Sequence, residues 1–217
     1  MAFEPLDPLD FLDDCELIMN KVMIFVDFEN FNIASVHLYR KKKRLAPRLD
    51  YNAMPQKLVD MLPGNNNRLV KTFLFAPKPD SFLLQDERRK NTYDWICGLK
   101  NQNYFTVIEG HHVARPVSGL DFKDMDINKP ETYYVEEKGT DVNMAAHLIT
   151  KGFLHAYDTA MVVTGDTDYI PTLDILNTIG KSTVSVGVKG QNMFKLKEHS
   201  DDLIILDETF FKSCIRP

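Results

Sequence analysis

Short apolar runs alternate along the chain with stretches in which apolar residues recur every three to four positions. The runs predict strands near residues 21–27, 69–75, 103–109, 160–164, 182–188 and 203–206. The periodic stretches predict helices near residues 30–39, 52–62, 81–100, 140–152, 168–179 and 191–199. Such alternation is typical of a mostly parallel sheet with helices on both faces. We therefore expect a single α/β domain of three layers, with a central sheet of about five or six strands.

Residues 110–138 do not fit this alternation. Pro116, Gly119 and Pro130 interrupt any regular spacing of apolar positions. The segment predicts a long loop, and only residues 132–135 are compatible with a short edge hairpin. Loops of this length in compact domains are commonly lids or binding elements, or are disordered.

Composition limits the possible classes of protein. The 217 residues are 44% hydrophobic, which suits one domain with a large core. The longest apolar runs, such as 22–26 and 160–163, fall far short of the roughly 20 residues that span a bilayer. Cys15, Cys97 and Cys214 are widely spaced, which argues against a disulfide framework and a thiolate zinc site. We expect a cytoplasmic protein that does not enter a membrane.

Charge is unevenly distributed. Residues 1–20 contain six acidic and no basic residues, a charge of −6, so the whole-chain charge of −5 leaves about +1 for residues 21–217. We divide the chain into an acidic leader (1–20), a domain (21–210) and a C-terminal tail (211–217). One hypothesis is that the leader folds over a basic surface of the domain and competes with the ligand that binds there. Another is that Met19 is a natural start and the leader matters little.

Acidic residues stand where the predicted strands end and helices begin. Asp27 ends the first apolar run, Asp166 and Asp168 follow the run at 160–163, and Asp141 opens a helix. Ligands collect at the carboxyl edge of an open parallel sheet, where the strand order reverses. Taken singly, Asp168 could be a helix N-cap, and Asp141 could simply be stabilised by the dipole of the helix that it opens. Their joint placement predicts a cluster of carboxylates.

Two polar residues strengthen this hypothesis. Asn30 lies three residues after Asp27, and Thr164 lies two before Asp166. Clustered carboxylates are suitable ligands for Mg²⁺ or Mn²⁺, and paired cations can activate water for phosphodiester cleavage. We expect Asp27, Asp141 and the Asp166–Asp168 pair to bind the metal, with Asn30 and Thr164 orienting them.

Three segments make the chain resemble the NYN domain family, a branch of the PIN-like, metal-dependent ribonucleases. The first is FVDFEN at 25–30, the second KGTD at 138–141, and the third TGDTDYIP at 164–171. The ending, from Gly180-Lys181 to Asp207, is also similar to the family. The resemblance extends from about Lys21 to Asp207.

The resemblance implies a PIN-like fold, an acidic pocket for Mg²⁺ or Mn²⁺, and hydrolysis of RNA. Carried over by position, Asp27, Asp141, Asp166 and Asp168 would be the metal-binding, catalytic acids. Lys138 would be a supporting residue of the pocket. Because PIN-like domains often assemble, the resemblance is also compatible with a homo-oligomer.

Two basic groups are candidates for contacts with RNA phosphates, although such runs are often only solvated faces. They are Arg40, Lys41, Lys42, Lys43 and Arg44 after the first helix, and Arg88 and Arg89, followed by Lys90, on the long helix. Phe28 and Tyr169 flank the acids and could stack on bases, although aromatic residues at strand ends are usually core. His111 and His112 do not indicate a zinc site, because adjacent side chains of an extended segment diverge and no Cys or His partner has ligand spacing.

Two other functions compete with the nuclease. The chain could be a PIN-like module that binds RNA or protein without cutting, but every expected acid is present. A phosphatase needs an aspartyl nucleophile two residues before a second acid, and the DFE sequence at 27–29 matches that pattern only loosely. The sequence therefore favours a metal-dependent ribonuclease.

Overall fold

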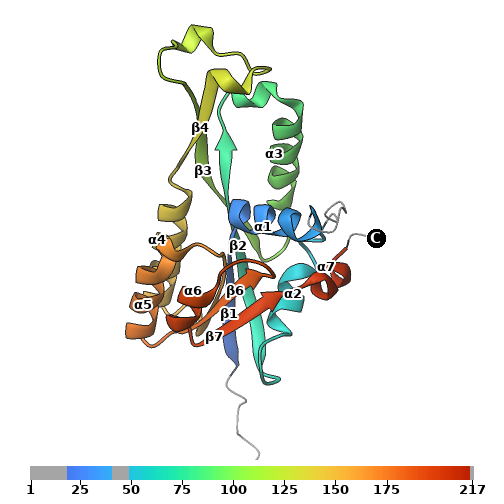
Figure 1. The fold of residues 1–217 in the computed structure, drawn as a ribbon. Helices are drawn as coiled ribbons and strands as arrows, with labels where there is room; N and C mark the ends of the chain where they lie inside the picture. The colour runs from blue at the N-terminus through green and yellow to red at the C-terminus, as the bar shows by residue number, and fades with distance from the viewer. Residues whose placement is uncertain (1–18, 41–48, 216–217) are drawn as a thin grey trace, which may run out of the picture.

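The computed structural model describes residues 19–40 and 49–215. The chain begins with β1 (Asn20–Asp27), α1 (Phe28–Arg40), α2 (Met54–Val59), β2 (Asn67–Pro79) and α3 (Glu87–Leu99). It continues with β3 (Phe105–Pro116), β4 (Tyr133–Lys138), α4 (Thr140–Phe153) and β5 (Thr159–Val163). It ends with α5 (Ile170–Thr178), β6 (Ser182–Val188), α6 (Phe194–Glu198), β7 (Asp202–Leu206) and α7 (Glu208–Ser213). Figure 1 shows this order.

One sheet of seven strands organises the domain, in the order β4-β3-β2-β1-β5-β6-β7. All neighbours are parallel except β3 and β4, which are antiparallel. The chain builds outward from β1 through β2 and β3, and from β5 through β6 and β7. The strand order therefore reverses between β1 and β5, which is where open α/β sheets bind ligands.

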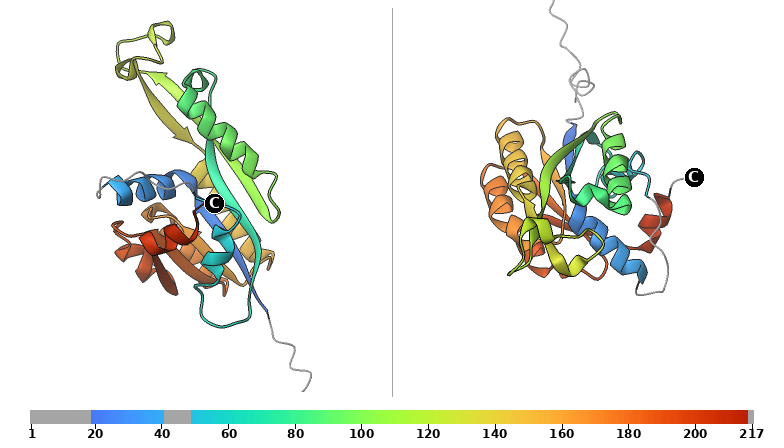
Figure 2. Two further views of the ribbon diagram at one scale, coloured as in Figure 1. Left: turned by 90° about the vertical axis from the view of Figure 1, so that its right-hand side faces the viewer. Right: turned by 90° about the horizontal axis from the view of Figure 1, so that it is seen from above.

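Alternating side chains of the central strands divide the core into two layers. Val22, Ile24 and Val26 of β1 face a cluster formed with α1, α2, α3 and α7. Met23 and Phe25 face the opposite cluster, formed with α4, α5 and α6. Successive residues of a strand point to opposite faces, so a continuous apolar run is buried on both sides. Figure 2 shows α4 and α5 on one side of the sheet and α1 and α3 on the other. The predicted α/β domain of three layers is confirmed.

The predicted long loop at 110–138 is wrong in part, and the sheet has one strand more than the five or six expected. β3 continues to Pro116, and β4 (Tyr133–Lys138) pairs with it, so only the segment between them is irregular. Here β2 and β3 extend past the end of β1, which pairs with β2 only as far as Phe75. Pro77 and Pro79 are compatible with this extension. Beyond Phe75 one edge of β2 has no partner strand, so a proline, which lacks a backbone N–H, removes no hydrogen bond on that edge. Figure 1 shows β3 and β4 rising beyond the rest of the sheet beside α3.

Among the described residues, no helix is long and apolar enough to cross a membrane. The acidic leader, apart from its last two residues, and the basic residues 41–44 lie outside the described part of the chain.

Candidate functional site

The candidate site lies at the carboxyl ends of β1 and β5, the two strands between which the sheet order reverses. Asp27 is the last residue of β1, and α1 begins directly after it. Thr164, Gly165 and Asp166 form the turn that follows β5. Since β1 and β5 are hydrogen-bonded neighbours, their ends bring these residues together.

Asp27 is buried, with 6% of its surface exposed. The backbone N–H of Asn30 donates to its Oδ1 at 3.1 Å, and the Thr164 hydroxyl donates to its Oδ2 at 3.0 Å. Burial raises the pKa of Asp27 to about 6, and the charges of Asp141 and Asp166 act in the same direction against the two hydrogen bonds. The site therefore holds a carboxylate that is costly to ionise while no cation is beside it.

Asn30 links the two strand ends. Its Oδ1 accepts the backbone N–H of Gly165 at 2.8 Å and the side-chain amide of Gln191 at 2.8 Å. Gln191 is tied in turn to the backbone N–H of Val188 at 2.7 Å. A Cβ at position 165 would lie 2.4 Å from the Gln191 amide nitrogen, so any larger residue there would displace the Gln191 side chain from Asn30.

Asp141 comes to the site from the first turn of α4, whose N-cap is Gly139. The Tyr169 hydroxyl donates to Asp141 Oδ1 at 2.8 Å. Tyr169 is only 2% exposed, and burial together with the charge of Asp27 raises its pKa. Phe28 is 6% exposed and contacts Trp95, so both aromatic residues belong to the core.

Asp166 and Asp168 occupy different positions in the turn after β5. Asp166 is half-buried; its backbone N–H donates to the Thr164 hydroxyl at 3.2 Å, and its Oδ1 accepts the Asp168 N–H at 3.0 Å. Asp166 therefore caps the 3₁₀ turn Thr167–Tyr169, the role that Asp168 could have had. Asp168 is exposed, and its own carboxylate makes no hydrogen bond or ion pair with another described residue.

The donor set fits a hard divalent cation. Within the described residues, no Lys, Arg or His nitrogen lies within 4.0 Å of a carboxylate oxygen of Asp27, Asp141 or Asp166. Carboxylate oxygens without a basic partner are the ligands that Mg²⁺ and Mn²⁺ prefer. The four aspartates do not bring three ligand oxygens within 4.8 Å of one another.

The predicted basic residues lie at several places. Lys138 is half exposed and pairs with Glu136 at 3.2 Å. Arg40 is the exposed last residue of α1, and Lys41, Lys42, Lys43 and Arg44 lie outside the described residues.

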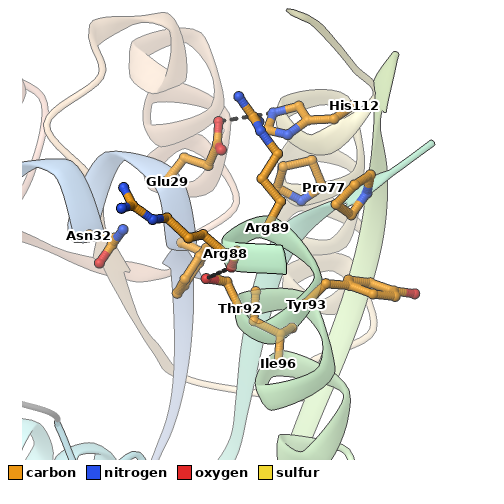
Figure 3. A pocket seen from close by; sticks show the side chains of 11 residues that line it. Glu29, Asn32, Pro77, Arg88, Arg89, Thr92, Tyr93, Ile96 and His112 are labelled. Atoms are coloured by element: carbon orange, nitrogen blue, oxygen red, sulfur yellow. Dashed lines mark hydrogen bonds and ion pairs between the residues drawn. The ribbon is translucent and has the colours of Figure 1, made fainter. Parts of the chain in front are cut away.

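Arg88 and Arg89 line a cavity of about 230 Å³ between α1 and α3. Its wall includes Phe28, Glu29 and Asn32 of α1, from the turns that follow Asp27. Figure 3 shows Arg88 and Asn32 on one side of this cavity and Arg89 near Glu29 and His112 on the other.

Sequence reasoning missed a second group beside the aspartates. One ligand atom each of Glu29, His112 and Glu137 lies within 4.8 Å of the others, which no other set of three or more His, Cys, Asp or Glu does in the described chain. Burial opposes ionisation of Glu29, but the hydrogen bond and charge of His112 lower its pKa. Burial raises the pKa of Glu137, and the charges of Glu29 and Asp141 add to the effect. No spacing in the sequence indicates this group, because its members come from three separate elements.

The reversed strand order and the acidic residues at the ends of β1 and β5 are consistent with an α/β domain of the PIN-like class. The NYN domain profile matches residues 21–207, so the chain belongs to the NYN domain family. That membership supports a nuclease-type role.

A solved structure shows the same fold. It is a protein of unknown function from Vibrio parahaemolyticus, which is 17% identical in sequence with a TM-score of 0.55. The alignment covers 88% of this chain and 94% of that chain. No curated protein matches the chain.

Proposed function

We propose that the protein is a metal-dependent ribonuclease that hydrolyses phosphodiester bonds of RNA. Asp27, Asp141, Asp166 and Asp168 would hold Mg²⁺ or Mn²⁺. The observation that carries this proposal is Asp27, a buried carboxylate close to two other acids and without a basic partner among the described residues. An uncompensated buried carboxylate is costly, and a divalent cation would remove that cost.

The residues of the chain would divide the work between them. Bound cations of this kind supply positive charge that activates water and stabilises the departing oxygen. Asn30 and Thr164 hold the Asp27 carboxylate in one orientation through its two oxygens. Tyr169 holds Asp141 through one of its two oxygens. Such rigid support matters because metal-binding geometry tolerates little displacement of its ligands.

The substrate strand would lie over the cavity between α1 and α3. Arg88 and Arg89 bring positive charge to its wall, and the first turn of α1 connects this wall to Asp27. Guanidinium groups bind phosphates well and would fix the position of the strand without reading its sequence.

Cleavage of an end-labelled single-stranded RNA and of a DNA with the matching sequence, both with Mn²⁺, tests the proposed substrate. We expect cutting of the RNA, with the DNA cut more slowly or not at all. Binding of RNA without cutting would instead support a non-cleaving module, and preferential cutting of DNA would contradict the proposed substrate class.

Substitution of Arg88 by Gln should weaken RNA binding measured with EDTA present, so that cleavage does not interfere. The loss of one phosphate contact should reduce the slope of log K against log[salt] by about 0.7 for a single strand. Lys90→Gln is the matched control, since Lys90 is exposed on the same helix but does not line the cavity. Equal salt slopes for the two variants would place the RNA elsewhere.

A further inference from the structure

Glu29, His112 and Glu137 form a compact group of ligand atoms outside the four aspartates. The His112 Nε2 lies 3.2 Å from Glu29 Oε2, and one ligand atom of each residue lies within 4.8 Å of the others. The side chains of His112 and Glu29 are 11% and 35% exposed, and Glu137 is exposed. The group is thus held in the fold on one side and open to solvent on the other.

The fold explains why these three residues meet. His112 and Glu137 are directly paired residues of the antiparallel strands β3 and β4, so their side chains lie on the same face. Glu29 stands in the first turn of α1, immediately after β1. His111 is paired with Lys138 and points to the opposite face, as alternation along a strand requires.

A buried hydroxyl lies next to this group. Thr140 is 2% exposed, and its Oγ1 makes no hydrogen bond of normal geometry. A longer contact of hydrogen-bond type between the same hydroxyl and the Glu137 carboxyl lowers the pKa of Glu137. Buried polar atoms are nearly always satisfied, and a hydrated cation held by the three ligand atoms would give this hydroxyl a full partner.

The charged residues around the group do not neutralise it. Arg89 is close enough to Glu29 to favour its ionised form, but none of its nitrogens lies within 4.0 Å of a Glu29 oxygen. Asp141 adds negative charge on the Glu137 side. Arg89 therefore forms no ion pair with Glu29.

We propose that Glu29, His112 and Glu137 form a second metal site, which binds a divalent transition-metal ion such as Mn²⁺ in preference to Mg²⁺. Two carboxylates provide hard oxygen ligands, and the imidazole nitrogen shifts the preference from Mg²⁺ toward transition metals. This site needs neither RNA nor cleavage, so it does not depend on the proposed function.

Electron paramagnetic resonance of Mn²⁺ in excess Mg²⁺ tests the site. One Mn²⁺ per chain should remain bound in this excess of Mg²⁺. His112→Gln and Glu137→Gln should each weaken this Mn²⁺ at least about tenfold, since even indirect partners of a metal ligand contribute 10- to 100-fold. His111→Gln is the matched control and should bind Mn²⁺ like the wild type. Asp166→Asn should also retain it.

Displacement of all Mn²⁺ by Mg²⁺ would overturn the proposal. Unchanged binding in both His112→Gln and Glu137→Gln would overturn it equally. Circular dichroism checks that each variant is folded, and the exposed position of Glu137 makes its isosteric substitution the safer of the two.

Discussion

Asp166→Asn should abolish most RNA cleavage while the protein stays folded and still binds RNA. The substitution keeps the size of the side chain and an Oδ1 that can accept the Asp168 N–H, but it removes the negative charge. Loss of one pre-organised electrostatic group typically costs about 10²–10³ in rate. Single-turnover cleavage with Mn²⁺ measures the effect, and RNA binding is measured in parallel.

The matched control is Asp202→Asn, since Asp202 is exposed at the start of β7, at the opposite edge of the sheet. It should cut RNA at the wild-type rate. Equal rates for Asp166→Asn and Asp202→Asn would remove Asp166 from the proposed site. Asp168→Asn belongs in the same series, because the exposed Asp168 carboxylate is the least constrained of the four.

Asp27→Asn should make the metal-free protein more stable at pH 8, although it should be inactive. The folded-state pKa of Asp27 is about 6 against an ordinary value of 3.8, so metal-free stability falls as pH rises between these values. An Asn side chain does not ionise, so the stability of the variant does not fall with pH for this reason. The difference corresponds to about 2 to 3 kcal/mol at pH 8, at 1.36 kcal/mol per pKa unit. Below pH 3.8 the gain should disappear, because Asp27 is then protonated in both states.

Urea unfolding in EDTA at pH 8 and at pH 3.5 measures this effect. Asp94→Asn is the control, because Asp94 is exposed on α3 and surface substitutions usually change stability by less than about 0.5 kcal/mol. A loss of stability in Asp27→Asn at pH 8 would mean that Asp27 is a structural carboxylate whose hydrogen bonds outweigh its burial.

The fold was predictable where a local pattern and the tertiary structure agree. The run at 22–26 is apolar at every position because β1 is buried on both faces, and the same holds for β5. Parallel strands such as β1 and β5 end at the same edge of the sheet, so the polar residues that follow them could be placed at that edge from the sequence alone. In the structure Thr164 donates a hydrogen bond to Asp27 at this edge.

Other features depend on pairing between distant segments and left no local pattern. Most of β3 beyond Gly110 and the whole of β4 are at least partly exposed, so their residues do not alternate cleanly between buried and exposed. Pairing of His112 with Glu137 is a matter of strand register, which nothing in the residues 110–138 specifies in advance. The contact of Gln191 with Asn30 joins residues 161 positions apart and was likewise unforeseen.

Reversible metal dependence is the most direct test of the proposed ribonuclease. Wild-type protein would be incubated with end-labelled single-stranded RNA in Mn²⁺, then in EDTA, and then with Mn²⁺ restored, with Asp27→Asn treated in parallel. We predict cutting that stops with EDTA, returns with Mn²⁺, and is absent from Asp27→Asn throughout. Cutting that persists in EDTA, or that Asp27→Asn performs at the wild-type rate, would contradict the proposal that aspartate-bound cations drive the reaction.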